Sequence, residues 1–194
     1  MDFSDVVRFH GHACPGLALG FRAAQAALGA LGRKRSADEE LVAIVENNSC
    51  AVDAIQVMLG CTFGKGNLIF RDYGKQVYTV LQRPSAEAVR LAVIWEAPPE
   101  RPEEKAAWEK YAAGSRDPDI VRVVHARKGA KVQAVLAADE EALFRISSMM
   151  VALPEPARIY PSLRCGRCGE KVMAPRARER EGQVLCIPCA EESS

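Results

Sequence analysis

The sequence predicts an α+β domain followed by a small zinc-binding domain. Helical patterns at 15–31 and 102–113 alternate with short apolar runs that are typical of strands. Two of those runs, at 67–73 and 76–81, flank a Gly-Lys pair, which indicates a hairpin. The sheet should therefore be mixed and largely antiparallel, with helices packed on it. Two C-x-x-C pairs near the C-terminal end predict the second domain.

The composition is that of an ordinary globular protein, since 48% of the 194 residues are hydrophobic and 26% are charged. A net charge of +1 gives no general argument for binding nucleic acid or an anionic membrane. The N-terminus is acidic and no apolar run approaches about 18 residues, so we expect neither a secretory signal nor a membrane span. Seven cysteines, four of them in C-x-x-C pairs, favour metal binding in a reducing cytoplasm over disulfides.

The first chemically rich stretch is residues 9–16, FHGHACPG. If this stretch is extended, alternation places His10, His12 and Cys14 on one face, where they could bind a metal. Pro15 suits the first turn of a helix, so Cys14 should lie near the helix N-cap. The helix dipole favours the thiolate there, which is the form that binds metals and acts as a nucleophile.

The helix that follows, 15–31, should end at Gly32. It carries a stripe of small residues, Gly16, Gly20 and Ala24, along which another backbone could approach closely. An apolar run at 41–46 predicts a strand buried on both faces.

The arrangement around Cys14 recurs after that strand. Cys50 stands at the start of a second predicted helix, with Ser49 as the candidate cap. Asp53 and Gln56 follow at steps of three, so they share a helix face with Cys50. We therefore expect Cys14 and Cys50 to lie near each other at matched helix starts.

Gly60 should end the second helix, and a glycine-rich turn follows Cys61. Lys65 and the backbone N–H groups around Gly64 and Gly66 could hold an anionic group. The alternative is a tight connection into the next strand, and the turn lacks the Walker A pattern.

The remaining core elements are short. In order, they are a strand at 90–95, a helix at 102–113, a short helix or a strand at 118–128, and a helix at 139–151 that would serve the core or a dimer surface.

A proline-rich boundary at 153–156 divides the chain into a core domain, 1–156, and a zinc-finger domain, 157–194. The two C-x-x-C pairs lie beyond this boundary and predict one tetrahedral structural zinc, because a hairpin between them can return the second pair to the first. The four expected ligands are Cys165, Cys168, Cys186 and Cys189.

Several separated motifs resemble the FmdE family, which is named for a subunit of formylmethanofuran dehydrogenase. They are residues 9–17 with Gly20-Phe21-Arg22, residues 50–56 and residues 60–68, in that order and spacing. The C-terminal stretches 165–173 and 182–189 are similar to the treble-clef zinc finger that many members carry.

The resemblance implies an α+β core, a zinc finger and a homodimer. It also implies an association with molybdenum- or tungsten-dependent formylmethanofuran dehydrogenase, which reduces carbon dioxide onto methanofuran. The sequence shows no pattern for binding molybdopterin or an iron-sulfur cluster. In any redox reaction, a partner oxidoreductase subunit would therefore hold the electrons.

The residues themselves point to a second transition-metal site in the core, with zinc as the expected metal. The candidate ligands are His10, His12, Cys14, Cys50 and Cys61. His12 is the preferred histidine because it is nearer to Cys14, and His10 would orient the site. The candidate catalytic residues are Cys14, His12, Cys50 and Asp53.

Three interpretations of the core site stay open. A metal with an open coordination position could bind or transform a small molecule. A thiolate flanked by histidine could act as a nucleophile without metal. A closed second zinc site would only stabilise the fold.

Two further functions compete with catalysis. One is a non-catalytic module that docks on an oxidoreductase partner through the finger. The other is nucleic-acid binding by residues 157–181, where seven Arg or Lys stand against three Glu. We prefer a solvated finger surface to nucleic-acid binding.

Overall fold

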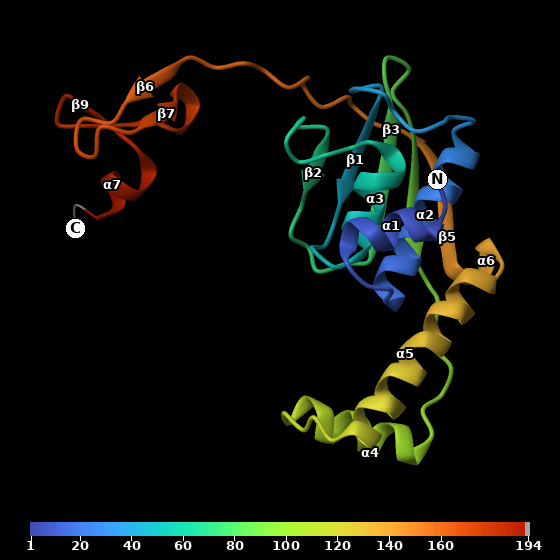
Figure 1. Cartoon of the computed structure of the whole chain (residues 1–194). Helices are drawn as coiled ribbons and strands as arrows, with labels where there is room; N and C mark the ends of the chain where they lie inside the picture. Colours follow the sequence, from blue (N-terminus) through green and yellow to red (C-terminus); the bar gives the residue numbers. More distant parts are fainter. Residues whose placement is uncertain (193–194) are drawn as a thin grey trace. The chain divides into compact units, whose positions relative to one another are not determined.

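The structure is a computed structural model that describes residues 1–192 (Figure 1). The chain divides into two compact units, one from Met1 to Pro156 and one that begins at Ala157. Each unit is described by itself. Among the described residues, no helix combines the length and the apolar character that crossing a membrane requires.

The first unit is built on a five-stranded sheet with the strand order β2-β1-β3-β4-β5. The strands are β1 (Leu41–Val45), β2 (Leu68–Phe70), β3 (Val77–Gln82), β4 (Glu87–Val93) and β5 (Phe144–Met150). β1 and β2 are parallel, and every other neighbouring pair is antiparallel. The predicted mixed, largely antiparallel sheet is confirmed.

The predicted hairpin between β2 and β3 is wrong, because β1 lies between these strands. Ile44 of β1 pairs with Ile69 on one side and with Thr79 on the other. β1 is buried at all five positions, so it takes a central place with both edges paired. The connection 71–76 is long enough to cross the roughly 10 Å of two strand spacings.

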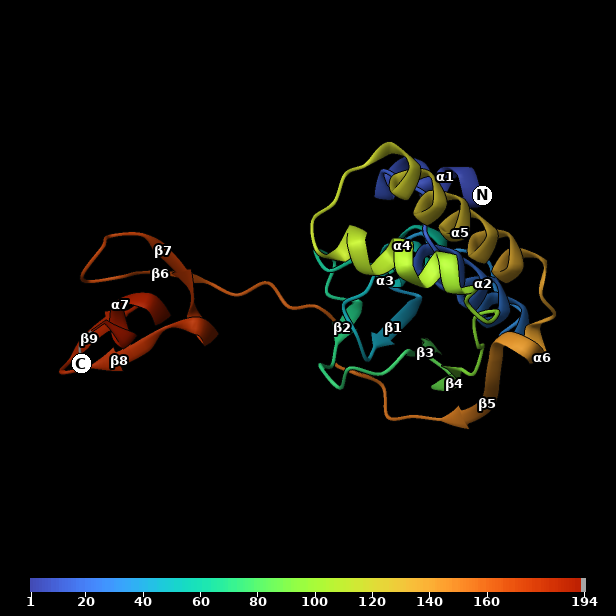
Figure 2. The ribbon, with the colours of Figure 1, turned by 90° about the horizontal axis from the view of Figure 1, so that it is seen from below.

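Six helices belong to this unit. They are α1 (Phe3–His10), α2 (Pro15–Ala30), α3 (Ala51–Leu59), α4 (Pro102–Ala112), α5 (Pro118–Ala137) and α6 (Glu140–Leu143). Figure 2 shows α1, α2, α3 and α5 on one side of the sheet. On the other face, Val42, Ile44, Leu81 and Ala88 form a small apolar cluster that Val151 helps to cover.

α2 is the central helix, and it contacts α3, α5 and β4. Its small residues allow this close packing, as the sequence predicted. A Cβ at Gly20 would lie 2.6 Å from Cα of Ala51, so only glycine allows α3 to approach at this level. On another side of α2, Arg22 donates hydrogen bonds to the carbonyls of Val135 and Leu136 near the end of α5.

The expected extended stretch at 9–14 is wrong at its beginning, because His10 is the last residue of α1. Asp2 caps that helix and forms a capping box with Asp5. Gly11 ends it in the left-handed conformation, with φ of 97°. His10 follows Val6 by four positions on the buried side of α1, a helical spacing that the extended interpretation missed.

Two C-terminal elements of the core also differ from the prediction. α5 continues to Ala137 instead of ending near 128, which excludes the alternative strand there. The predicted helix at 139–151 is mostly strand: only Glu140–Leu143 is helical, and β5 then pairs with β4 along seven residues. Sheet pairing outweighs the helical preference of this Leu- and Met-containing stretch.

The second unit consists of short elements around four cysteines. They are β6 (Ser162–Arg164), β7 (Lys171–Met173), the 3-10 helix η1 (Ala174–Arg176), β8 (Arg178–Arg180), β9 (Gln183–Leu185) and α7 (Ile187–Glu191). β6 pairs with β7 and β8 pairs with β9, both antiparallel. Among the described residues of this unit, only Leu185 and Ala190 accompany the cysteines in its small apolar cluster, so bound metal has to supply much of the stability.

Candidate metal sites

Cys14 is the N-cap residue of α2, as its position before Pro15 predicts. Its backbone is extended, and its Sγ accepts a hydrogen bond of 3.4 Å from the backbone N–H of Leu17. The thiol is half-buried. It therefore lies at the positive end of a sixteen-residue helix dipole.

Cys50 is the N-cap residue of α3, whereas Ser49 does not take the predicted capping role. The Ser49 hydroxyl donates instead to Oδ1 of Asn47, at 2.7 Å. Burial, and then a hydrogen bond with Cys14, raise the pKa of the Cys50 thiol. The pair thus holds a proton more tightly than a free thiol does, and a bound cation would replace it.

The packing of α2 on α3 brings the two thiols together. A Cβ at Gly16 would lie 3.5 Å from the Cβ of Cys50, so the absent side chain leaves room for the start of α3. The expected proximity of Cys14 and Cys50 is confirmed by their mutual hydrogen bond.

His10 completes a three-residue cluster, which we call the core triad: His10, Cys14 and Cys50. One ligand atom from each lies within 4.8 Å of the other two. Bond lengths of about 2.0 Å to nitrogen and about 2.3 Å to sulfur place tetrahedral zinc ligands about 3.5 Å apart. The triad is therefore close to a zinc-binding arrangement of one nitrogen and two sulfurs.

Asp53 fixes the orientation of the His10 ring. Its Oδ2 lies 2.7 Å from Nδ1 of His10, and a carboxylate can only accept, so Nδ1 carries the hydrogen. The lone pair is then on Nε2, which is buried and has no hydrogen-bond partner among the described residues. A buried imidazole nitrogen without a partner, next to two thiols, fits a metal ligand.

The two histidines have exchanged the predicted roles. His12 is exposed and lies outside the triad, although its ring centroid is 4.6 Å from that of His10. Sequence proximity to Cys14 favoured His12, but α1 carries His10 toward α3, and the Gly11 turn leaves His12 at the surface.

The structure does not bring Cys61 into the triad. It follows the C-terminal end of α3, about 13 Å of helix away from Cys50, and is fully buried in the hydrophobic core. Burial raises the pKa of the Cys61 thiol to about 12, which keeps it protonated.

Lys65 and its glycine-rich turn also lie beyond the C-terminal end of α3. The Lys65 ammonium donates to the carbonyl of Asp38 at 2.7 Å, and its backbone N–H donates to Thr62. The N–H of Gly66 donates to the carbonyl of Phe63. These donors already have acceptors, so the turn fits a tight connection, and neither Gly64 nor Gly66 is near the triad.

The second unit holds a four-cysteine cluster. Cys165 and Cys168 stand between β6 and β7, and Cys186 and Cys189 stand at the start of α7. All four sulfurs lie within 4.8 Å of one another. This matches the tetrahedral ligand set that the paired C-x-x-C spacing predicts.

Backbone donors prepare this cluster for a cation. N–H groups of Cys168 and Cys186 lower the pKa of Cys165 to about 6. A hydrogen bond with Cys186 raises the pKa of Cys189 to about 12, so the metal-free cluster retains protons. Metal binding would release them.

Comparisons with known proteins agree with this division. A family model described as FmdE, molybdenum formylmethanofuran dehydrogenase operon, matches residues 9–145. A model of the prokaryotic dksA/traR C4-type zinc finger matches residues 158–194.

Two individual proteins are similar to the chain. A protein of Archaeoglobus fulgidus described as a probable S-adenosyl-L-methionine-binding protein is 34% identical over 199 residues, which cover 94% of this chain and 50% of that protein. The chain thus spans about half the length of this curated relative.

The second is a tungsten formylmethanofuran dehydrogenase FmdE-like protein from Syntrophus aciditrophicus, whose crystal structure has the same fold. The TM-score is 0.63 at 20% identity, over 98% of this chain and 90% of that chain. Because the first family model matches well over half of its residues, the chain belongs to the FmdE family, and it carries a C4 zinc finger at its C-terminal end.

Proposed function

We propose that the core of this metal-binding FmdE-like protein holds one transition-metal ion through the core triad and leaves a coordination position open for a small molecule. The observation that carries the proposal is the buried, unpartnered Nε2 of His10 beside the thiols of Cys14 and Cys50. One nitrogen and two sulfurs suit zinc.

The residues of the triad have distinct tasks in this proposal. Cys14 and Cys50 supply two thiolates from two helix N-termini, and Asp53 holds the His10 ring so that Nε2 faces the metal. When bound, zinc supplies a Lewis acid that can polarise a ligand oxygen. The exposed His12 lies beside His10, where it can accept or donate a proton.

Three protein ligands with a fourth position for a substrate are typical of catalytic zinc sites, whereas four cysteines are typical of structural ones. In this proposal the finger therefore has a structural role and the core triad acts on the ligand. A treble-clef finger is supported by the order of cysteine knuckle, β8–β9 hairpin and α7.

Cobalt(II) substitution of the full chain tests whether the core position is open. We expect azide to change the visible spectrum of the wild-type protein. The Cys14→Ala variant, which keeps only the finger cobalt, should show no such change. A core cobalt spectrum that does not respond to azide would indicate a closed, structural site.

S-adenosylmethionine is a second candidate ligand, favoured by the description of the Archaeoglobus fulgidus relative, which is similar to 94% of this chain. Isothermal titration calorimetry with the zinc-loaded full chain tests it. Saturable binding in the micromolar range would support this candidate, and no heat at millimolar ligand would reject it.

Docking of the finger on an oxidoreductase subunit remains an alternative role, and homodimer formation is compatible with both proposals. Purification from the native host discriminates between them. A stable oxidoreductase partner would support docking, and a solitary homodimer would count against it.

A further inference from the structure

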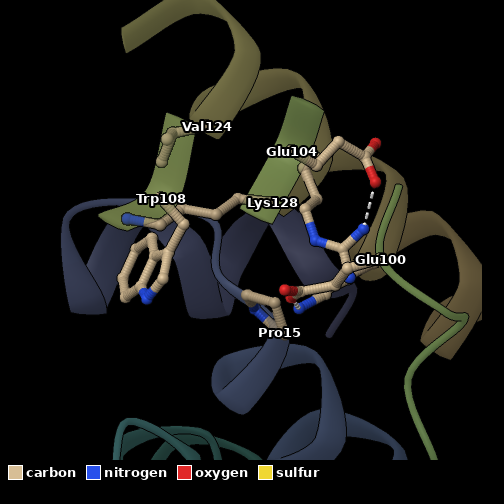
Figure 3. Close-up of a pocket in the computed structure, with 8 residues that line it drawn as sticks. Pro15, Glu100, Glu104, Trp108, Val124 and Lys128 are labelled. Atoms are coloured by element: carbon tan, nitrogen blue, oxygen red, sulfur yellow. Dashed lines mark hydrogen bonds and ion pairs between the residues drawn. The ribbon is translucent and has the colours of Figure 1, made fainter. Parts of the chain in front are cut away.

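A cavity of about 360 Å³ lies between α4 and α5, beside the beginning of α2 (Figure 3). Its size is within the range of small-molecule sites, about 300 to 1,000 Å³. Pro15 lines this cavity, and it directly follows the triad residue Cys14. The cavity is therefore next to the candidate metal site.

The aromatic wall of the cavity is Trp108 of α4. This side chain is 47% exposed, which is high for a large apolar ring, and it stacks on Tyr111 with ring centroids 5.9 Å apart. Figure 3 shows Trp108 and Pro15 around the same space. A second flat ring could cover the Trp108 face and bury apolar area there.

Most charges around the cavity are paired with each other. Arg127 is paired with both Glu100 and Glu104, and Lys131 lies 3.4 Å from Glu100. Glu104 and Arg127 are nearly buried, with side-chain exposures of 11% and 12%. This network is a fixed wall with no net charge.

Lys128 is the exception. Among the ion pairs of residues 1–192 it has no carboxylate partner, and its ammonium lies 5.7 Å from the Trp108 ring centroid and 5.3 Å from that of Tyr111. It is half-buried, and Figure 3 shows its side chain running toward Trp108. The cavity thus has one uncompensated positive charge beside an aromatic face.

The same wall contains a free hydrogen-bond donor. Nε of Arg127 is buried and has no acceptor among the described residues. A buried donor without a partner is unfavourable, so a ligand oxygen that accepts from it would be stabilised.

We propose that this cavity binds a small molecule with an aromatic ring and one carboxylate, with the ring against Trp108 and the carboxylate beside Lys128. The inference deepens the proposed function and rests on it in one respect, namely that this ligand would lie next to the metal of the core triad.

Calorimetry with three probes tests the inference on the zinc-loaded full chain. The probes are 2-naphthoate, the uncharged 2-naphthamide and the non-aromatic cyclohexanecarboxylate. We expect 2-naphthoate to bind about fivefold more tightly than 2-naphthamide, and cyclohexanecarboxylate to bind about tenfold more weakly, since one charge pair and one ring contact separate them.

Variants assign these preferences to the residues. Lys128→Ala should remove the preference for 2-naphthoate over 2-naphthamide. Trp108→Leu should weaken both naphthalene probes about tenfold. Lys105→Ala, an exposed lysine of α4 that does not line the cavity, should change neither.

Equal affinities of the wild-type protein for 2-naphthoate and 2-naphthamide would overturn the inference, as would affinities that are unchanged in both variants. Zinc is measured on the same samples. If the expected probe pattern occurs in protein that lacks core zinc, the cavity assignment stands and the proposed metal function fails.

Discussion

The two cysteine-rich sites of this chain are built in opposite ways. The finger takes four cysteines from a single stretch of 25 residues, and the described part of its unit has almost no other core. The triad takes one residue from the end of α1 and one from the start of each of α2 and α3, inside a well-packed domain. The finger needs its metal in order to fold, whereas the core provides a folded place for a metal to work.

Removing one finger ligand should have the largest effect. In Cys186→Ser we expect the second unit to unfold, because apparent zinc-binding free energies of about 10 to 16 kcal/mol are folding free energies in such domains. Limited proteolysis should cut beyond residue 157 while the core resists. In the matched Cys14→Ser variant both units should resist, and proteolysis of its core would contradict the comparison.

The two neighbouring histidines provide the next test. His10→Ala should release the core zinc at micromolar free zinc, because it removes the one nitrogen ligand of the triad. His12→Ala should retain that zinc, since His12 lies outside the triad. Zinc analysis after gel filtration measures both variants. The opposite pattern would restore the order that the sequence predicted.

Asp53 distinguishes an oriented site from a mere cluster. Asp53→Asn removes the charged acceptor from Nδ1 of His10 and should weaken core zinc binding about 10- to 100-fold. Competition with a chromophoric chelator measures the affinity. The exposed Asp72→Asn is the matched control and should bind zinc like the wild-type protein. Equal affinities in the two variants would mean that the Asp53 contact is not used.

Cys61, a thiol of neither site, should have the smallest effect, and only at high pH. Its pKa is about 12 in the folded protein and 9.0 in a model thiol. Above pH 9 the unfolded chain loses this proton first, so unfolding becomes easier as pH rises. At pH 10 the loss is about 1.4 kcal/mol of unfolding free energy.

Urea unfolding at pH 8 and pH 10 checks this value. Cys61→Ala should lose about 1.4 kcal/mol less than the wild-type protein between the two pH values. The same loss in both proteins would mean that Cys61 ionises as an ordinary thiol.

The same contrast explains how much the sequence could predict. The finger ligands follow from local spacing, and the helix starts at Cys14 and Cys50 follow from Pro15 and the small residues of α2. The choice of His10 over His12 depends on how α1 lies against α3, which is a tertiary contact. It could be anticipated only by reading 3–10 as an amphipathic helix capped by Asp2.

The sheet shows a similar limit. The strands were predicted at nearly the right places, but the insertion of β1 between β2 and β3 depends on long-range pairing. The conversion of 144–150 from predicted helix to β5 has the same cause, because β4 offers that segment a free edge. Local patterns identify candidate elements, and the choice among their partners is made by the whole domain.

The zinc content of the full chain tests the central claim most directly. The account predicts two zinc ions per wild-type chain and one in the Cys14→Ser, Cys50→Ser double variant, with the finger still folded. One zinc ion per chain in both proteins would contradict it, because the core triad would then hold no metal.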